Sequence, residues 1–287
     1  MSFFFFGVTY IYTSKTKRRS GRVQSGKMTG DELIRRMNGE EESKEEEIVC
    51  LDESFFINDD YQLTTFTFGS HVLQLLCLQS ASTDFDLTGQ LVWPGAKLLN
   101  DYLSKNAEML QGCSVLELGS GVGVTGILCG RFCRQVVLTD HNDEVLKIIK
   151  KNIELHAPSV NPNSCAELEA VKLEWGSSDQ INQILGRYSG GFDLILGADI
   201  CFQQSSIPLL FDTVEQLLRF RGEHCKFILA YVSRAKIMDT LVIKEAAQHG
   251  MRMNEVPGTR ALIGNLEGVI FEVSINKNHQ ISLILGQ

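Results

Sequence analysis

Short apolar runs alternate with amphipathic stretches along the chain from residue 113 to its C-terminal part. The runs VLEL, QVVLTD, LILGAD and KFILAYV are typical of buried parallel strands. Between them, stretches such as DEVLKIIKKNIELH are amphipathic, because Val145, Ile148, Ile149 and Ile153 recur on one helix face. Strands that alternate with helices of this length predict right-handed βαβ units, and hence a mostly parallel sheet with helices on both faces.

The expected elements define the fold class. Strands are predicted at 113–118, 135–140, 166–175, 192–199, 226–232, 251–257 and 268–276, and helices at 124–132, 143–156, 207–220 and 236–250. A further helix follows Pro94, and two β-rich runs at 61–68 and 71–79 predict a hairpin. The last two strands have no helix between them, so we expect them to pair antiparallel. The predicted fold is α/β: a doubly wound, mostly parallel seven-stranded sheet with an antiparallel C-terminal hairpin and a small N-terminal β extension.

The N-terminal region differs in composition from the rest of the chain. FFFFGVTYIY is apolar but is about half the length needed to span a bilayer, and a basic stretch follows it. Residues 40–47, EEESKEEE, reverse the charge and are typical of a solvated linker. We therefore predict a disordered extension at 1–47, N-terminal β elements at 48–92, and the main α/β domain at 93–287.

Composition and charge narrow the class of protein. With 44% hydrophobic and 22% charged residues the composition is that of a soluble globular protein, and a formal net charge of −8 argues against a general nucleic-acid binder. The eight cysteines form no CxxC pair, so we expect reduced core thiols in a cytoplasmic or nuclear protein. The six histidines show no metal-ligand spacing, and no metal is expected. We expect a monomer without a membrane span.

The stretch VLELGSGVGVTG, residues 115–126, runs from a strand into a glycine-rich turn. Its glycines match G-x-G-x-G and also the G-x-G-x-x-G of dinucleotide-binding proteins. Asp140 ends the next strand, and a carboxylate there can accept two hydrogen bonds from ribose hydroxyls, which NAD and S-adenosylmethionine both present. The alternative for Asp140 is to cap the helix that begins near Asp143.

Glu117, two positions before Gly119, distinguishes the two ligands. A carboxylate at this position would repel the pyrophosphate of a dinucleotide. S-adenosylmethionine has no phosphate and carries an ammonium group on its methionine end, so an acid there suits it. Gly121 and Gly123 allow the backbone to pass close to the ligand, whereas Gly126 lies one turn into the helix and is expected to serve helix–strand packing.

Five segments in order resemble the seven-β-strand, S-adenosylmethionine-dependent methyltransferases, and among them the family-16 group of protein-lysine methyltransferases. The segments are GQLVWPGAKLLNDYL, VLELGSGVGVTG, VVLTDHNDEVLKIIKKNI, KLEWG and FDLILGADICF, and the resemblance covers about residues 60–275. It implies a set of residues that line the cofactor: Trp93, Gly119, Ser120, Gly121, Asp140, Trp175 and Ala198. The two tryptophans fit this implication, because a neutral adenine favours an aromatic or apolar slot.

The fourth strand ends in GADICF, which matches the family's acidic D-x-x-[YF] segment. The resemblance implies that this segment faces the substrate amine. Asp199 would hold the incoming ammonium and help it lose its proton, and Phe202 would form one wall of a narrow aromatic channel. The family more commonly has tyrosine in place of Phe202, which lacks the hydroxyl, and Tyr231 at the end of the fifth strand is an alternative source of one.

The leading expectation is an enzyme that transfers a methyl group from S-adenosylmethionine to the side-chain amine of a lysine in a protein substrate. Two alternatives keep the cofactor: an enzyme acting on a small-molecule amine, and a non-catalytic, cofactor-binding interaction module. The missing hydroxyl at Phe202 favours the second, whereas the hairpin at 61–79 favours a peptide acceptor because it could border a groove. Glu117 argues against an NAD-dependent oxidoreductase.

Overall fold

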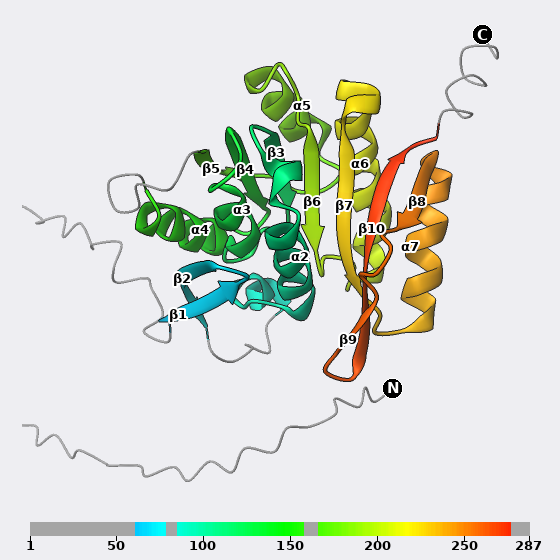
Figure 1. The fold of residues 1–287 in the computed structure, drawn as a ribbon. Coiled ribbons are helices and arrows are strands. Elements are labelled where there is room, and N and C mark those ends of the chain that lie inside the picture. Colours follow the sequence, from blue (N-terminus) through cyan, green and yellow to red (C-terminus); the bar gives the residue numbers. More distant parts are fainter. Residues whose placement is uncertain (1–60, 79–84, 158–165, 277–287) are drawn as a thin grey trace, which may run out of the picture. The chain divides into compact units, whose positions relative to one another are not determined.

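A mostly parallel sheet lies at the centre of the structure (Figure 1), a computed structural model that describes residues 61–78, 85–157 and 166–276. Its strands run in the order β5-β4-β3-β6-β7-β10-β8, with the short β9 paired to β10. They are β3 (Ser114–Leu118), β4 (Gln135–Asp140), β5 (Glu167–Lys172), β6 (Leu194–Ala198), β7 (Lys226–Val232), β8 (Met251–Glu255), β9 (Ala261–Ile263) and β10 (Leu266–Ile275). Strands β3 to β7 are parallel and β10 is antiparallel to both β7 and β8, which confirms the predicted fold class.

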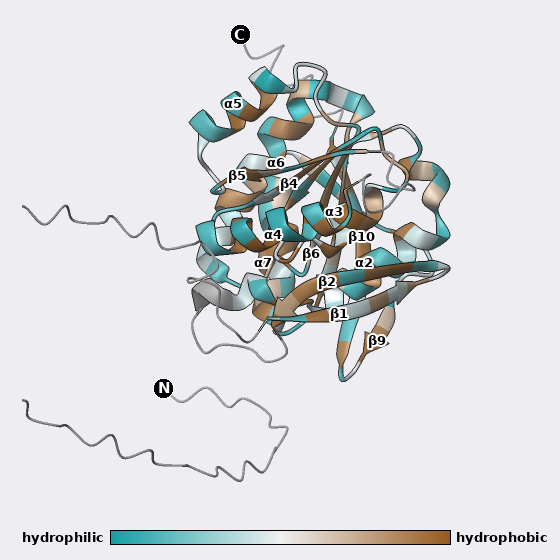
Figure 2. Ribbon diagram, turned by 90° about the vertical axis from the view of Figure 1, so that its left-hand side faces the viewer, coloured by the Kyte–Doolittle hydropathy of each residue, from teal (hydrophilic) through white to brown (hydrophobic). Residues whose placement is uncertain are grey.

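Three helices cover each face of the sheet. One face carries α2 (Pro94–Lys105), α3 (Val124–Cys129) and α4 (Asp143–Leu155), and the other carries α5 (Ser178–Arg187), α6 (Ile207–Arg221) and α7 (Lys236–Gln248). Because side chains alternate along a strand, Val115 packs into the first core, whereas Leu116 and Leu118 pack into the second. Figure 2 shows the apolar strands enclosed between helices that expose their polar faces.

The predicted N-terminal hairpin is present as β1 (Tyr61–Phe68) and β2 (His71–Leu78), paired antiparallel. It lies against α3 and α4, and its buried residues join the core on that face of the sheet. Asn152 of α4 joins this hairpin to the glycine turn: its amide donates to the carbonyl oxygens of Leu76 (3.0 Å) and Val122 (2.9 Å) and accepts from the Leu76 N–H (2.8 Å). The extension predicted at 1–47 lies outside the described residues, and the boundary between 92 and 93 stays a prediction.

Several element boundaries differ from the predictions. Helix α5 was not predicted, although Ile181, Ile184 and Leu185 are buried at helical spacing. Helix α3 ends at Cys129 rather than at 132, with Gly130 as its C-cap. The strand predicted over 166–175 ends at Lys172, so that Trp175 lies in the loop after β5. Four 3-10 helices complete the described elements: η2 (Phe85–Gln90), η3 (Ala107–Leu110), η4 (Gln204–Ser206) and η5 (Gly222–His224).

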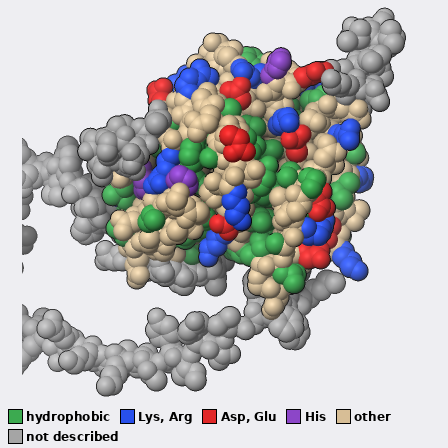
Figure 3. Space-filling view, in the orientation of Figure 1, with side chains coloured by type: hydrophobic (Ala, Val, Ile, Leu, Met, Phe, Trp, Pro, Cys, Tyr) green, Lys and Arg blue, Asp and Glu red, His purple; other side chains and the backbone are tan. Residues whose placement is uncertain are grey.

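Charged side chains of both signs lie on the surface, and most of the described cysteines are buried. Figure 3 shows basic and acidic side chains interspersed on the face viewed in Figure 1. The cysteines within the described ranges are all free, and all of them except Cys113 are buried. Among the described helices, none combines the length and apolar character that crossing a membrane requires.

Candidate functional site

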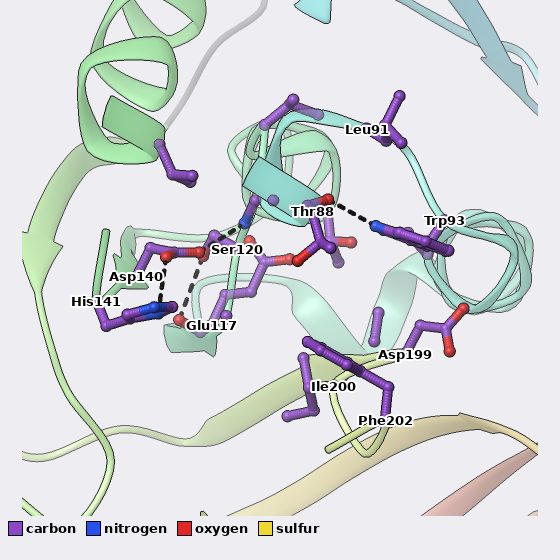
Figure 4. Close-up of a pocket in the computed structure, with 18 of the residues that line it drawn as sticks. Thr88, Leu91, Trp93, Glu117, Ser120, Asp140, His141, Asp199, Ile200 and Phe202 are labelled. Atoms are coloured by element: carbon purple, nitrogen blue, oxygen red, sulfur yellow. Dashed lines mark hydrogen bonds and ion pairs between the residues drawn. The ribbon is translucent and has the colours of Figure 1, made fainter. Parts of the chain in front are cut away.

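A cavity of about 280 Å³ opens where β3, β4 and β6 end at their carboxyl termini, the edge at which open α/β sheets bind ligands. The structure brings together every residue predicted for the site, since all of these line the cavity: Trp93, Glu117, Gly119, Ser120, Gly121, Asp140, Trp175, Ala198, Asp199 and Phe202. In Figure 4, Asp140 lies toward one end of the cavity, Glu117 in the middle, and Trp93 and Phe202 toward the other end. Their individual roles stay predictions.

The glycine turn is built by close backbone packing. Gly121 has a φ of +53°, and a Cβ there would lie 2.7 Å from the carbonyl oxygen of Gly89 in η2. Gly126 lies inside α3, where a Cβ would meet the Leu138 side chain at 2.5 Å. This crowding supports the interpretation of Gly126 as a packing residue. The turn is therefore held by the N-terminal segment as well as by the sheet.

Replacing Gly121 with alanine should disturb both the turn and its ligand. The positive φ and the contact with Gly89 together should cost about 2 kcal/mol of unfolding free energy, and S-adenosylhomocysteine binding should weaken about tenfold or more. Urea unfolding and titration calorimetry measure the two effects. The matched control is Gly186→Ala in α5, where a Cβ meets nothing within 4 Å and the change should be neutral or slightly stabilising. Equal behaviour of the two variants would contradict the prediction.

Glu117 places a buried carboxyl group at the middle of the cavity. The strand alternation turns it to the α3 side of the sheet, where its Oε2 accepts the Gly126 N–H at 2.9 Å and only 3% of the residue is exposed. Burial raises the pKa of Glu117 to about 7, although hydrogen bonds from Ser120, Gly126 and Thr125 oppose the rise. In the described part of the chain, Glu117 forms no ion pair with Lys, Arg or His.

Asp140 lies at the end of β4 and supports the neighbouring turn. One carboxylate oxygen accepts the Gly121 N–H at 3.2 Å and the other accepts the Asn142 N–H at 3.1 Å. The alternative that Asp140 caps the following helix is wrong, because the N-cap of α4 is Asn142, whose side chain accepts from the N–H groups of Glu144 and Val145. Asp140 lines the cavity, and each of its oxygens accepts a single backbone N–H, so each can still accept a hydrogen bond from a ligand hydroxyl.

Among the residues that the structure describes, Asp199 is the one non-glycine residue with a positive φ, at 60°. Its side chain is 2% exposed and forms an ion pair with Arg234, which follows β7. The Asp199 Oδ2 accepts from Arg234 Nη2 at 2.9 Å and from the Gly95 N–H at 3.0 Å, while Oδ1 accepts from Arg234 Nη1. Both oxygens are thus engaged within the protein, which leaves the carboxylate little capacity for an incoming ammonium group.

Three aromatic side chains line the cavity. Trp175 is half-buried, and its Cζ2 lies 3.4 Å from where a Cβ on Gly119 would be. Phe202 is 45% exposed at the mouth. Trp93 is held by a hydrogen bond from its Nε1 to the Thr88 carbonyl oxygen, 2.8 Å long and visible in Figure 4.

The alternative role for Tyr231 is wrong. Alternation along β7 turns Tyr231 to the α6 and α7 face of the sheet with Phe227 and Leu229, away from the cavity. Its hydroxyl donates to Asp239 of α7 at 2.6 Å. Tyr231 therefore supplies no hydroxyl to the site.

Comparison with known proteins identifies the family. A family profile described as lysine methyltransferase matches residues 74–247, which is more than half of the chain. The chain belongs to this lysine methyltransferase family. The membership confirms the resemblance predicted from the five segments, and the S-adenosylmethionine cofactor predicted from Glu117 and the glycine turn agrees with it.

Relatives of the lysine methyltransferase family match the same region. The chain is 35% identical over 166 residues to protein N-lysine methyltransferase METTL21A from Mus musculus, a match that covers 57% of this chain and 66% of that protein. It is 29% identical over 168 residues to the protein N-terminal and lysine N-methyltransferase EFM7 from Yarrowia lipolytica, which covers 53% of this chain and 60% of that protein. The chain thus spans less than two thirds of the length of either relative.

The chemistry of the cavity fits the cofactor of a lysine methyltransferase. A buried carboxylate without a cationic side-chain partner is costly, and the ammonium of the methionine end would neutralise it. Asp140, toward one end of the cavity, offers oxygens to ribose hydroxyls, and Trp175 offers an aromatic surface to adenine. Glu117, Asp140 and Trp175 would therefore hold the cofactor along the cavity.

Three residues that contribute to the site, two in η2 and one after β7, were not predicted from the sequence. Thr88 and Gly89 line the cavity from η2, where sequence patterns show only a polar loop. Arg234 reaches Asp199 from 35 positions away in the chain, and no motif includes it. The SR pair that follows the strand KFILAYV was a weak signal, because a charged residue directly after a strand of the sheet lies at the ligand-binding edge.

Proposed function

We propose that this protein transfers a methyl group from S-adenosylmethionine to the side-chain amine of a lysine in a protein substrate. Family membership supports the reaction class. The observation that carries the proposal is the cavity itself. It has a buried carboxyl group in its middle that forms no ion pair with any described residue, and an exposed aromatic side chain at its mouth. The first feature suits the cofactor and the second suits a long aliphatic amine that enters from solvent.

Residues of this chain would orient the reactants. When bound, the cofactor supplies an electrophilic methyl group on a sulfonium. Glu117 holds the ammonium group of the cofactor and Asp140 its ribose. Phe202 borders the path by which the acceptor enters, and Trp93, which the sequence predicted to line the cofactor, lies toward the same end of the cavity. The acceptor must arrive as a neutral amine, so its proton leaves to solvent at the open mouth, where Phe202 is 45% exposed. Alignment of the amine with the methyl group then supplies much of the rate.

Labelling in a lysate tests the function directly. The purified protein is incubated with S-adenosylmethionine labelled in its methyl group and a hypomethylated lysate, and labelled proteins are digested to find the modified residue. The Gly121→Ala variant serves as the control with impaired cofactor binding. Label on a lysine side chain supports the proposal. Label confined to small amines or to protein N-termini would show that the acceptor is not a lysine side chain. Cofactor binding without any methyl transfer would favour the non-catalytic module.

The aromatic wall at Phe202 gives a prediction of its own. Phe202→Ala should lower kcat/KM for the protein substrate about 10- to 100-fold, because the aliphatic part of the lysine loses its contact surface. The affinity for S-adenosylhomocysteine should change less than about threefold. Phe220→Ala is the matched control, since Phe220 is similarly exposed, at 49%, but lies outside the cavity lining. A loss in Phe220→Ala equal to that in Phe202→Ala would contradict this role.

A further inference from the structure

The end of the cavity toward which Trp93 and Phe202 lie, called the acceptor end below, is supported by the ion pair between Asp199 and Arg234. No sequence motif includes Arg234. Asp199 directly follows β6 and adopts a backbone conformation that is unfavourable for a residue with a side chain, with φ at 60°. Its N–H donates to the Ala230 carbonyl oxygen of β7 at 2.9 Å, which holds the strained residue in place. A non-glycine residue in this conformation persists when its surroundings require its side chain in one position.

That position puts the Asp199 side chain against the first turn of α2. The Gly95 N–H donates to Asp199 Oδ2, and a Cβ on Gly95 would lie 2.7 Å from the Asp199 Cβ. Only glycine at 95 permits this approach. Gly95 follows Trp93 by two residues, so the contact fixes the segment that carries Trp93 relative to the loop that carries Phe202.

Arg234 completes the arrangement from the end of β7. Its guanidinium binds both carboxylate oxygens of Asp199, and its Nη1 also donates to the Val232 carbonyl oxygen at 3.3 Å. The guanidinium carbon lies 5.8 Å from the centre of the Trp93 ring, within cation–π distance. Arg234 therefore contacts Trp93 directly and holds it a second time through Asp199 and Gly95.

The charges of the pair have a consequence for the acceptor. The guanidinium and the carboxylate neutralise each other, so the pair presents no net negative charge to an incoming ammonium group. The Asp199 side chain is also 2% exposed, which leaves almost none of its surface to the acceptor. A carboxylate bound in this way is suited to holding neighbouring groups and not to accepting a proton from a substrate.

We propose that Arg234 is a positioning residue which, with Asp199 and Gly95, sets the spacing between Trp93 and Phe202 at the acceptor end, and that Asp199 acts as part of this support and not as a proton acceptor. The inference rests on the proposed methyl transfer for its kinetic consequence only. The structural consequence, the placement of the first turn of α2, is independent of the reaction.

The test compares Arg234→Met, Asp199→Asn and the double variant. Arg234→Met strands a buried carboxylate, and Asp199→Asn turns an amide toward the guanidinium, so each should lower kcat for the identified acceptor about tenfold or more. The double variant removes both charges, while an asparagine side chain at position 199 can still accept the Gly95 N–H and tolerates the positive φ. It should be at least about tenfold more active than either single variant. The affinity for S-adenosylhomocysteine should stay within about threefold throughout.

Hydrogen–deuterium exchange of residues 93–97 supplies a readout that needs no substrate. Arg234→Met should speed exchange there about tenfold. Arg234→Lys keeps one charged contact and is less disruptive to folding, so it should speed exchange about threefold. Arg221→Met is the matched control, because Arg221 forms a similar ion pair with Asp193 at the opposite edge of the sheet, and it should change neither kcat nor this exchange.

Two results would overturn the proposal. Unchanged exchange over 93–97 in both Arg234 variants would show that Arg234 does not hold this segment. A double variant no more active than Asp199→Asn would show that the carboxylate itself is needed in the chemistry. If no acceptor of any class is methylated, the proposed function fails, and the exchange measurement still decides the role of Arg234.

Discussion

Replacing Glu117 with glutamine is expected to stabilise the free protein at about pH 8 while weakening its binding of S-adenosylhomocysteine about tenfold or more. Glu117 is 3% exposed, and burial raises its pKa from 4.5 to about 7. Glutamine has nearly the same shape and keeps an oxygen for the Gly126 N–H. Glutamine lacks the negative charge. That charge destabilises the folded protein but strengthens the binding of an ammonium group.

The direction of the pH dependence follows from the raised pKa. Below about pH 4.5 Glu117 is protonated both folded and unfolded, so its burial carries no charge penalty. As the pH rises toward and through about 7, the unfolded state ionises freely while the folded state resists ionisation, and stability is lost. The loss reaches about 3 kcal/mol above pH 7, so the advantage of Glu117→Gln should grow from near zero to that size.

Cofactor affinity should show the opposite dependence. The ammonium of the ligand favours the ionised carboxyl group, so the affinity of the wild-type protein should rise as Glu117 ionises, by up to about tenfold per pH unit below pH 7. The affinity of Glu117→Gln should be low and nearly flat.

Urea unfolding and titration calorimetry between about pH 5.5 and about pH 8 measure both effects of Glu117→Gln. Glu154→Gln is the control, because it removes the same formal charge from an exposed position on α4. Parallel pH profiles of stability for wild type and Glu117→Gln would contradict the assignment of a raised pKa, and unchanged affinity would contradict the contact with the ligand ammonium.

Replacing Asn152 with leucine is expected to be the most damaging single change to the attachment of the hairpin. Asn152 is fully buried and makes three hydrogen bonds, two with Leu76 and one with Val122. Leucine has a similar volume but leaves all three backbone groups without partners, which should cost about 3 to 5 kcal/mol of unfolding free energy. Because Val122 lines the cavity, affinity for S-adenosylhomocysteine should also fall.

Two measurements separate detachment of the hairpin from general unfolding of Asn152→Leu. Urea unfolding gives the total loss, and hydrogen–deuterium exchange should show β2 losing protection before β3 and β4 do. Asn106→Leu at the end of α2 is the control, because the Asn106 side chain donates one hydrogen bond to the Tyr102 carbonyl oxygen. A loss in Asn152→Leu no greater than in Asn106→Leu would contradict the proposed attachment.

The order of strands and helices could be predicted because it depends on local patterns. The apolar runs from 113 onward and the amphipathic face of α4 are properties of neighbouring residues, and the sheet and helix both formed where they indicated. Helix α5 was missed although its apolar spacing was visible, and β9 is three residues long, too short for a periodic signal. Helix α3 is shorter than predicted and ends at Cys129.

Part of the candidate site could likewise be predicted from the sequence, and part could not. Sequence by itself indicated that the glycines, Glu117, Asp140, Trp175, Asp199 and Phe202 would meet at one edge, because each lies at the end of a strand or in the loop after it, and parallel strands end together. Trp93 precedes a helix, and only the family resemblance placed it at the site. Tertiary structure alone decided which partners those groups have. The pairing of Asp199 with Arg234, the support of Gly121 by Gly89 and the three bonds of Asn152 join residues far apart in the chain. Tyr231 points away from the cavity because alternation along β7 turns it to the face of the folded sheet that α6 and α7 cover. Hydrogen bonds and ion pairs depend on distances of a few ångströms that folding sets, whereas strand ends are set by the chain's own periodicity.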